Sequence, residues 1–142
     1  MPVLSLEAVR AFLAEEFPQI DGTYAIQAVS PMGARTRLIF HERHLRPGGT
    51  ISGPAMFGLA DVSLYAAILA NVGVVGHAVT TNLNINFLVK PKPADLIGEA
   101  RLIKLGKRLA VGEVSIFGQG GDELVAHAVG TYSIPTRPNT VS

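Results

Sequence analysis

The segment from Pro54 to Ala70 contains 17 residues and a single charged side chain, that of Asp61. Pro54 suits the first position of a helix, where its missing N–H costs nothing, and Ser52 can cap that helix. A helix that is apolar on nearly all sides belongs either in the core of a folded domain or in a membrane. The segment therefore requires a surrounding layer, and this requirement limits the folds open to the chain.

Length alone would allow a membrane span, because residues 54–75 form a run of 22 residues. Against a span, Asp61 near the middle would cost roughly 3 kcal/mol in a bilayer. The segments that flank the helix also read as strands, and strands need a layer to pack against. We therefore expect a core helix and no membrane partner.

The residues before this helix predict one further helix and two strands. Apolar side chains spaced three and four apart indicate an amphipathic helix from Ser5 to Phe17, within an N-terminal segment of residues 1–20. Ser5 can cap this helix and Pro18 stops it. Residues 24–30 and 34–40 read as short strands around a turn.

From residue 77 onward, apolar side chains recur at every second position. Leu83, Ile85 and Phe87 share one face of an expected strand, and the asparagines between them share the other. Further strands are expected at 96–105, 109–117 and 124–134, and residues 136–142 are expected to be a loose tail. The whole chain, residues 1–142, is thus predicted to be a single α+β domain with a buried helix beside a mainly antiparallel sheet.

Composition excludes several classes of protein. The formal net charge is +1 and the basic residues are not clustered, so no nucleic-acid partner is expected. The absence of cysteine excludes disulfides, thiolate metal sites and a cysteine nucleophile. No basic and then apolar leader is present, which favours a cytoplasmic protein. The mean hydropathy of +0.33 is high for a soluble monomer and indicates association with copies of the same chain.

Asp61 is the first candidate for a functional residue. An unpaired carboxylate in a core is strongly disfavoured, so it must be paired, protonated or used chemically. A structural role would be to accept hydrogen bonds and fix the register of the helix. A functional role is favoured by the glycines just upstream, Gly48, Gly49 and Gly53, which let the backbone approach a ligand closely.

Gly53 and Asp61 together suggest a hydrolytic site. Free N–H groups at a helix start favour negative charge, so Gly53 could polarise a carbonyl oxygen while Asp61 supplies a carboxylate. The two residues are eight positions apart, which is about 12 Å along a helix. One chain cannot easily place both groups on the same carbonyl carbon. We therefore expect a second copy, with its helix running the other way, to supply half of each site.

Other candidates are weaker. His41 and His44 are three residues apart, but no third ligand has useful spacing, so we expect a surface pair and no metal site. Ser52 lacks the sequence context of a serine nucleophile. Asn82, Asn84 and Asn86 form a polar row, of which Asn82, nearest the helix, could touch a substrate.

Three segments resemble a known family in their order and spacing: GGTISGPAMFGLAD, TTNLNINFLVKP and LIKLGKRLAVGEVSIFGQGGDELVAHAVGTYSI. They are similar to the hotdog-fold thioesterases, specifically the phenylacetate-degradation (PaaI-like) type of acyl-CoA thioesterase, over about residues 24–135. The resemblance implies a long helix wrapped by a curved antiparallel sheet, a homodimer often paired into a homotetramer, an acyl-CoA substrate and no cofactor.

The resemblance also assigns roles to individual residues. Asp61 matches the family's catalytic acid, which acts as general base or nucleophile, and Gly53 matches the glycine whose N–H polarises the thioester carbonyl. Lys90, Lys107 and Arg108 lie where such proteins often meet coenzyme A, although solvated surface charges are the alternative.

Three positions depart from the family pattern. Arg46, Ser52 and Pro54 stand where the family commonly has Asn, His and Gly. These residues are still expected to contact substrate: Ser52 can donate a hydrogen bond, and Arg46 can hold Asp61 ionised or bind an acidic acyl group. The loss of the imidazole leaves a non-catalytic acyl-CoA binder as the alternative function. The presence of Asp61 favours the enzyme, because a binder has no need of a buried carboxylate.

Overall fold

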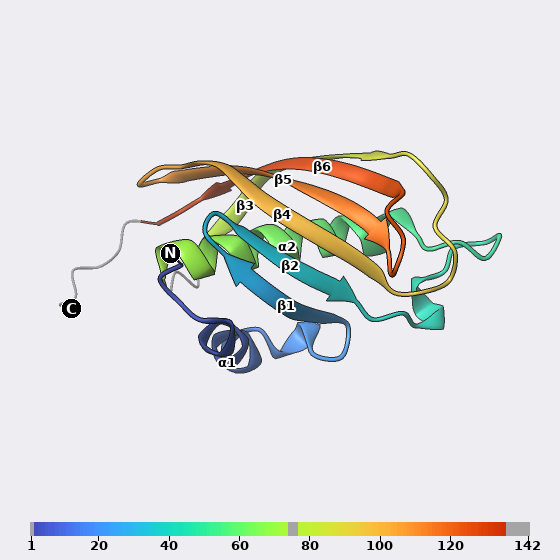
Figure 1. Cartoon of the computed structure of the whole chain (residues 1–142), viewed down its shortest axis with the longest axis horizontal. Coiled ribbons are helices and arrows are strands. Elements are labelled where there is room, and N and C mark those ends of the chain that lie inside the picture. Colours follow the sequence, from blue (N-terminus) through green and yellow to red (C-terminus); the bar gives the residue numbers. More distant parts are fainter. Residues whose placement is uncertain (1, 74–76, 136–142) are drawn as a thin grey trace.

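The computed structural model describes residues 2–73 and 77–135 and shows one helix wrapped by one sheet (Figure 1). The sheet has six strands in the order β1-β2-β4-β5-β6-β3, and every neighbouring pair is antiparallel. Helix α2, Gly53–Val72, packs against the sheet, and the shorter helix α1, Leu6–Glu16, packs beside β1 and α2. The strands are β1 Tyr24–Ser30, β2 Gly33–Leu38, β3 Val79–Phe87, β4 Leu96–Leu105, β5 Leu109–Gly118 and β6 Leu124–Ser133.

The predicted α+β fold is confirmed, and most predicted boundaries hold within two residues. Ser5 caps α1 as expected, by accepting from the N–H of Ala8. Strand β2 ends at Leu38 rather than at the expected residue 40, because the next two amides bond elsewhere. The N–H of Ile39 donates to the carbonyl of Thr23, and that of Phe40 donates to the carboxylate of Asp95 at 2.7 Å. The tail expected at 136–142 lies outside the described residues.

Helix α2 is the core of the molecule. Ser52 caps it, Pro54 lies in its first turn, and Gly73, with φ of 106°, ends it in the left-handed region that favours glycine. It is long and apolar enough to cross a membrane, but 72% of the relevant stretch is buried against the rest of the chain, as is typical of a core helix. The sheet approaches it closely at glycines: a Cβ added to Gly112 would lie 2.6 Å from Cδ2 of Leu64.

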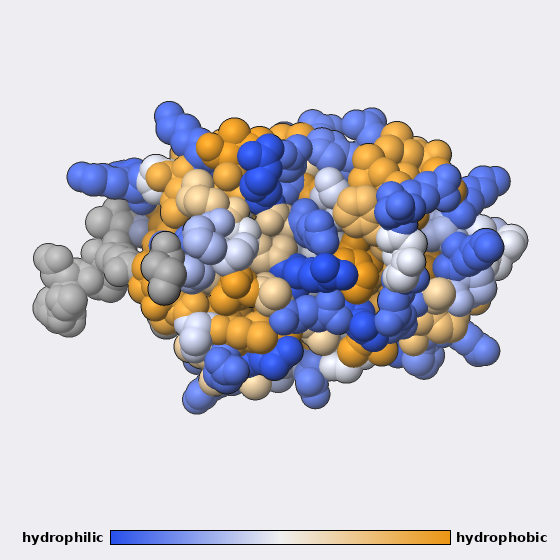
Figure 2. Space-filling model, in the orientation of Figure 1, coloured by the Kyte–Doolittle hydropathy of each residue, from blue (hydrophilic) through white to orange (hydrophobic). Residues whose placement is uncertain are grey.

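The outer face of the sheet is largely polar. Exposed ion pairs join neighbouring strands there, including Arg35 with Glu99 at 3.2 Å and Arg101 with Glu113 at 2.5 Å. Figure 2 shows hydrophilic side chains interspersed with hydrophobic ones across the face of the molecule that carries β1, β2 and β4. The sheet therefore buries one face on α2 and exposes the other to solvent, as antiparallel sheets commonly do.

Strand β3 shows the predicted alternation and lies at an edge of the sheet. Leu83 and Ile85 pack against the core, whereas Asn82, Asn84 and Asn86 are exposed. Among the described strands, only β6 pairs with β3, so the other side of β3 is an open sheet edge within residues 2–73 and 77–135. Large apolar side chains are exposed at both of its ends: Val79, Phe87, Leu88 and Val89. An open, apolar edge of this kind favours a partner chain.

One expectation about α2 was wrong: Asp61 is not in the core. Its side chain is only half-buried, and it shares a stripe of the helix with two exposed residues, Pro54 and Phe57, the latter 40% exposed. The spacing of three and then four residues places all three on one face. The sheet and α1 pack against other sides of α2, and this stripe, here called the open face of α2, offers an exposed surface to another molecule.

Candidate active site

The carboxylate of Asp61 is held through one of its two oxygens. Oδ1 accepts from the hydroxyl of Thr80 at 2.6 Å and from the phenol of Tyr132 at 2.5 Å. The two donors come from adjacent strands, since Thr80 of β3 pairs with Tyr132 of β6. No side chain in residues 2–73 and 77–135 donates to Oδ2. As far as these residues are concerned, the second oxygen is left for water or a substrate.

The groups around Asp61 are neutral hydroxyls. Burial raises the pKa of the Tyr132 phenol, and the negative charge of Asp61 raises it further, so the phenol stays protonated and can donate. Burial and then Asp61 also raise the pKa of Tyr24, whose hydroxyl donates to the carbonyl of Ala55 at 3.3 Å. No cation of the described segments lies within ion-pair distance of Asp61. Within one chain, then, Arg46 does not pair with Asp61.

The first turn of α2 leaves one backbone N–H free. Pro54 has none, the N–H of Ala55 donates to the Ser52 hydroxyl at 3.3 Å, and that of Met56 donates to the Ser52 carbonyl at 3.2 Å. Nothing in the described part of the chain accepts from the N–H of Gly53. Because the positive end of the helix dipole lies there, this amide suits an oxygen that carries or develops negative charge.

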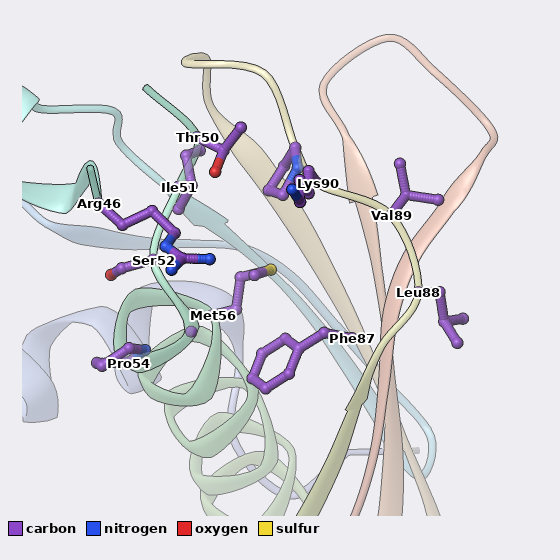
Figure 3. A pocket seen from close by; sticks show the side chains of 12 residues that line it. Arg46, Thr50, Ile51, Ser52, Pro54, Met56, Phe87, Leu88, Val89 and Lys90 are labelled. Atoms are coloured by element: carbon purple, nitrogen blue, oxygen red, sulfur yellow. The ribbon is translucent and has the colours of Figure 1, made fainter. Parts of the chain in front are cut away.

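A cavity of about 600 Å³ opens beside this amide (Figure 3). Its walls include five of the residues predicted from sequence, namely Arg46, Ser52, Gly53, Pro54 and Lys90. The remainder of the lining is mostly apolar and comes from loops, the end of β3 and the first turn of α2: Thr50, Ile51, Met56, Phe87, Leu88, Val89 and Pro91. Figure 3 shows Arg46 and Phe87 approaching the start of α2 from opposite sides, with Lys90 above them. An apolar cavity with a few cations is typical of a site for an anionic ligand that also carries an apolar part.

A tight turn holds the Arg46 side of this cavity. The N–H of Arg46 donates to the carbonyl of Thr50 at 2.9 Å, and the chain reverses through Gly48 and Gly49, with φ of 104° and 82°. These two positions require the left-handed conformation that glycine adopts at little cost. Gly48 and Gly49 are thus needed for the turn, whereas Gly53 lies at the start of α2.

The remaining predicted residues are not all near these groups. Lys107 and Arg108 form the turn between β4 and β5, which lies at the opposite end of the molecule from the start of α2 (Figure 1). Asn82 pairs with Thr131 and lies with Asn84 on the outer side of β3. The residue of β3 that reaches Asp61 is Thr80. One chain therefore carries two separate clusters, one at the start of α2 and one around Asp61.

Sequence reasoning missed the two hydroxyls that hold Asp61. Strict alternation back from Leu83 would place Thr81 on the helix side of β3. A bulge between Thr80 and Asn82 places Thr80 there instead, and the hydroxyl of Thr81 donates to the carbonyl of Thr131. Tyr132 is 71 residues from Asp61, and no local pattern indicates that contact.

The expectation of a surface histidine pair was only half right. His41 is exposed, but His44 is 8% exposed and therefore buried. Nδ1 of His44 accepts from the N–H of His41, and Nδ1 of His41 accepts from the N–H of Arg43, so both rings cap a short 3₁₀ turn. Burial lowers the pKa of His44, and nearby Arg43 and His41 lower it further. The carbonyl of His44 accepts from Ser52, which anchors the turn to the start of α2.

A long apolar helix that carries one acid and is wrapped by a single antiparallel sheet defines a protein of the hotdog fold. Within the described residues, the chain leaves one carboxylate oxygen and one helix-start amide without a partner. The thioesterase superfamily is the family whose model matches this sequence, over residues 48–125. The chain belongs to the thioesterase superfamily, and the predicted PaaI-like hotdog architecture is confirmed.

Individual relatives agree with this assignment. The crystal structure of a candidate thioesterase from Silicibacter sp. TM1040 is 48% identical, has a TM-score of 0.86, and aligns over 95% of this chain and 94% of that one. A candidate esterase of Saccharolobus solfataricus is 30% identical over 138 residues, which are 97% of this chain and 85% of the relative. The E. coli PaaI protein from the phenylacetic acid degradation operon is 19% identical, has a TM-score of 0.80, and aligns over 92% of this chain and 93% of its own, which shows a shared fold. The matches support hydrolytic thioesterase activity.

Proposed function

We propose that this protein hydrolyses an acyl-CoA thioester to the free acid and coenzyme A, at sites formed between two copies of the chain. The proposal rests on the positions of two groups on helix α2. The free oxygen of Asp61 and the free N–H of Gly53 belong to the same helix, about 12 Å apart along it, and that helix has one open face. A second copy with its helix antiparallel would bring the Gly53 of one chain toward the Asp61 of the other.

The chemistry then needs no further group. The N–H of Gly53 donates to the thioester oxygen and stabilises the charge that develops on it. Asp61 either attacks the carbonyl carbon itself or takes a proton from a water that attacks. The carbon–sulfur bond breaks, and coenzyme A leaves as a thiolate that takes up a proton. Hydrolysis of the thioester, or of an anhydride formed on Asp61, consumes one water and releases the acid.

The cations are suited to the coenzyme A portion. Arg46 and Lys90 line the cavity beside Gly53, and phosphate oxygens are natural partners for both. Lys107 and Arg108 lie at the other end of the sheet from this cavity, where the carbonyl of Arg108 accepts from the N–H of Ile134, two residues after Tyr132, at 2.7 Å. In an antiparallel pair these two residues would approach the partner's cavity.

A hydrolysis screen tests the proposal. Short, long and aromatic acyl-CoA esters would be incubated with the protein, and released thiol measured with a thiol reagent. Because the chain has no cysteine, the reagent reports only coenzyme A. We expect turnover of at least one class, and turnover lower by about a hundredfold or more with Asp61→Asn under the same conditions. Tight binding of the esters without turnover would instead support the non-catalytic acyl-CoA binder, which the replacement of the family's His by Ser52 favours.

The protein is expected to be a dimer or a larger assembly in its active form. The open face of α2 and the exposed edge of β3 leave Phe57, Val79 and Phe87 in contact with water in a single chain. Sedimentation velocity over a range of concentrations, with activity measured in the same samples, checks this expectation. A folded and active monomer would contradict both the assembly and the shared site.

Gly53→Ala is expected to lower kcat/KM by about tenfold or more, because it disturbs an oxyanion donor. The added Cβ would lie 3.2 Å from Cζ of Phe87, so the ring must move into the cavity where the thioester oxygen is expected. Dimerisation should not change. Full activity of Gly53→Ala on the best substrate, with unchanged sedimentation, would show that this amide is not the oxyanion donor.

A further inference from the structure

Tyr132 is buried, with 4% of its surface exposed, yet its hydroxyl is directed at the one acid of the site. The phenol donates to Oδ1 of Asp61 at 2.5 Å and also lies 3.0 Å from the backbone carbonyl of Asp61. We propose that Tyr132 is a positioning residue for the reaction: it fixes Oδ1 of Asp61, so that Oδ2 faces the substrate. This inference rests on the proposed function, in which Asp61 acts as base or nucleophile.

The ring of Tyr132 is itself held in place. It stacks on Tyr65 of α2, with centroids 6.2 Å apart and an interplanar angle of 12°. Tyr65 in turn meets Phe17 edge to face at 6.4 Å. Aromatic packing of this kind fixes the direction of the hydroxyl before a substrate arrives. A fixed donor holds the carboxylate in one orientation, which lowers the cost of reaching the reactive geometry.

The positioning role follows from what else faces Asp61. The titratable groups around it are phenols, Tyr132 from β6 and Tyr24 from β1, and the remaining donor is the uncharged hydroxyl of Thr80 from β3. No cation of residues 2–73 and 77–135 forms an ion pair with the carboxylate. Hydrogen bonds from the hydroxyls are therefore what holds the carboxylate in place within one chain. Because burial and the charge of Asp61 raise the pKa of Tyr132, its phenol stays protonated and remains a donor.

Thr80 and Tyr132 hold Asp61 through different contacts. Thr80 donates to Oδ1 from the edge strand β3, whereas Tyr132 donates to Oδ1 and also reaches the backbone carbonyl of Asp61 from β6, inside the sheet. Loss of the phenol hydroxyl would leave Oδ1 with one donor at the sheet edge. The carboxylate could then rotate about its Cβ–Cγ bond, and Oδ2 would no longer be held toward the substrate.

The test compares Tyr132→Phe with a matched control, Tyr24→Phe. Both changes remove one phenol oxygen near Asp61, but the hydroxyl of Tyr24 donates to the carbonyl of Ala55 and not to the carboxylate. For Tyr132→Phe we expect a loss of kcat of about tenfold with little change in KM. A loss of this size corresponds to one hydrogen bond to a charged group, and its appearance in kcat rather than in KM separates a positioning role from a role in binding. Tyr24→Phe should change kcat much less, because both donors to Oδ1 stay in place.

A second measurement does not depend on turnover. Carbon-13 NMR of labelled aspartate, with the Asp61 signal assigned by its loss in Asp61→Asn, reports the hydrogen bonding of this carboxyl directly. The chemical shift of the carboxyl carbon should change in Tyr132→Phe and much less in Tyr24→Phe. An unchanged Asp61 signal in Tyr132→Phe, or a Tyr132→Phe variant that does not fold, would overturn the positioning role in favour of a structural one. A wild-type protein that hydrolyses no acyl-CoA ester would contradict the proposed function, whereas the NMR result would still test the contact between Tyr132 and Asp61.

Discussion

Asp61→Asn is expected to lower turnover by about a hundredfold or more, which is the usual contribution of a positioned base. The amide keeps the shape of the carboxyl group, and its oxygen can still accept from the hydroxyls of Thr80 and Tyr132. What the substitution removes is the negative charge on the free oxygen. Folding, assembly and coenzyme A binding should therefore be nearly unchanged.

Turnover and melting temperature of Asp61→Asn and the wild type, measured side by side, separate the two roles of this residue. We expect the melting temperature to stay the same or to rise, because a partly buried charge is removed. Full activity of the variant would exclude Asp61 from the reaction. A variant that does not fold would show that the residue fixes the register of α2 instead.

Mixing two inactive variants is expected to restore activity, if each site takes Gly53 from one chain and Asp61 from the other. Gly53→Val should be nearly inactive, because its side chain would collide with the ring of Phe87 and cover the amide. In a hybrid of Gly53→Val and Asp61→Asn chains, one of the two sites contains both native groups. Random assembly would therefore recover about a quarter of the wild-type activity.

The matched control replaces Gly53→Val in the mixture by a chain that carries both substitutions. Its hybrid with Asp61→Asn has no site with a native acid, so no activity should return. Refolding or co-expression produces the mixtures, and sedimentation shows whether hybrids have the size of the wild type. No recovery in the first mixture, with hybrids present, would place the whole site within one chain.

The sequence by itself determined the elements and the main candidates of the site. An apolar run with one acid requires a surrounding layer, and period-two alternation places the strands that supply it. Ser52 and Pro54 define the start of α2 because capping and the missing N–H act within one turn. Gly53 and Asp61 follow from the same local reasoning, since the helix rise fixes their separation whatever surrounds them.

Tertiary structure decided which groups meet Asp61. Its half-exposed position depends on which face of α2 the sheet leaves open, and the choice of Thr80 over Thr81 depends on a bulge in β3. Tyr132 reaches the acid only because β6 lies beside β3 and carries that side chain inward. The local sequence pattern indicates which positions of an element face the core. It does not indicate which distant side chain contacts each of these positions, because strand order and register arise from packing over the whole sheet.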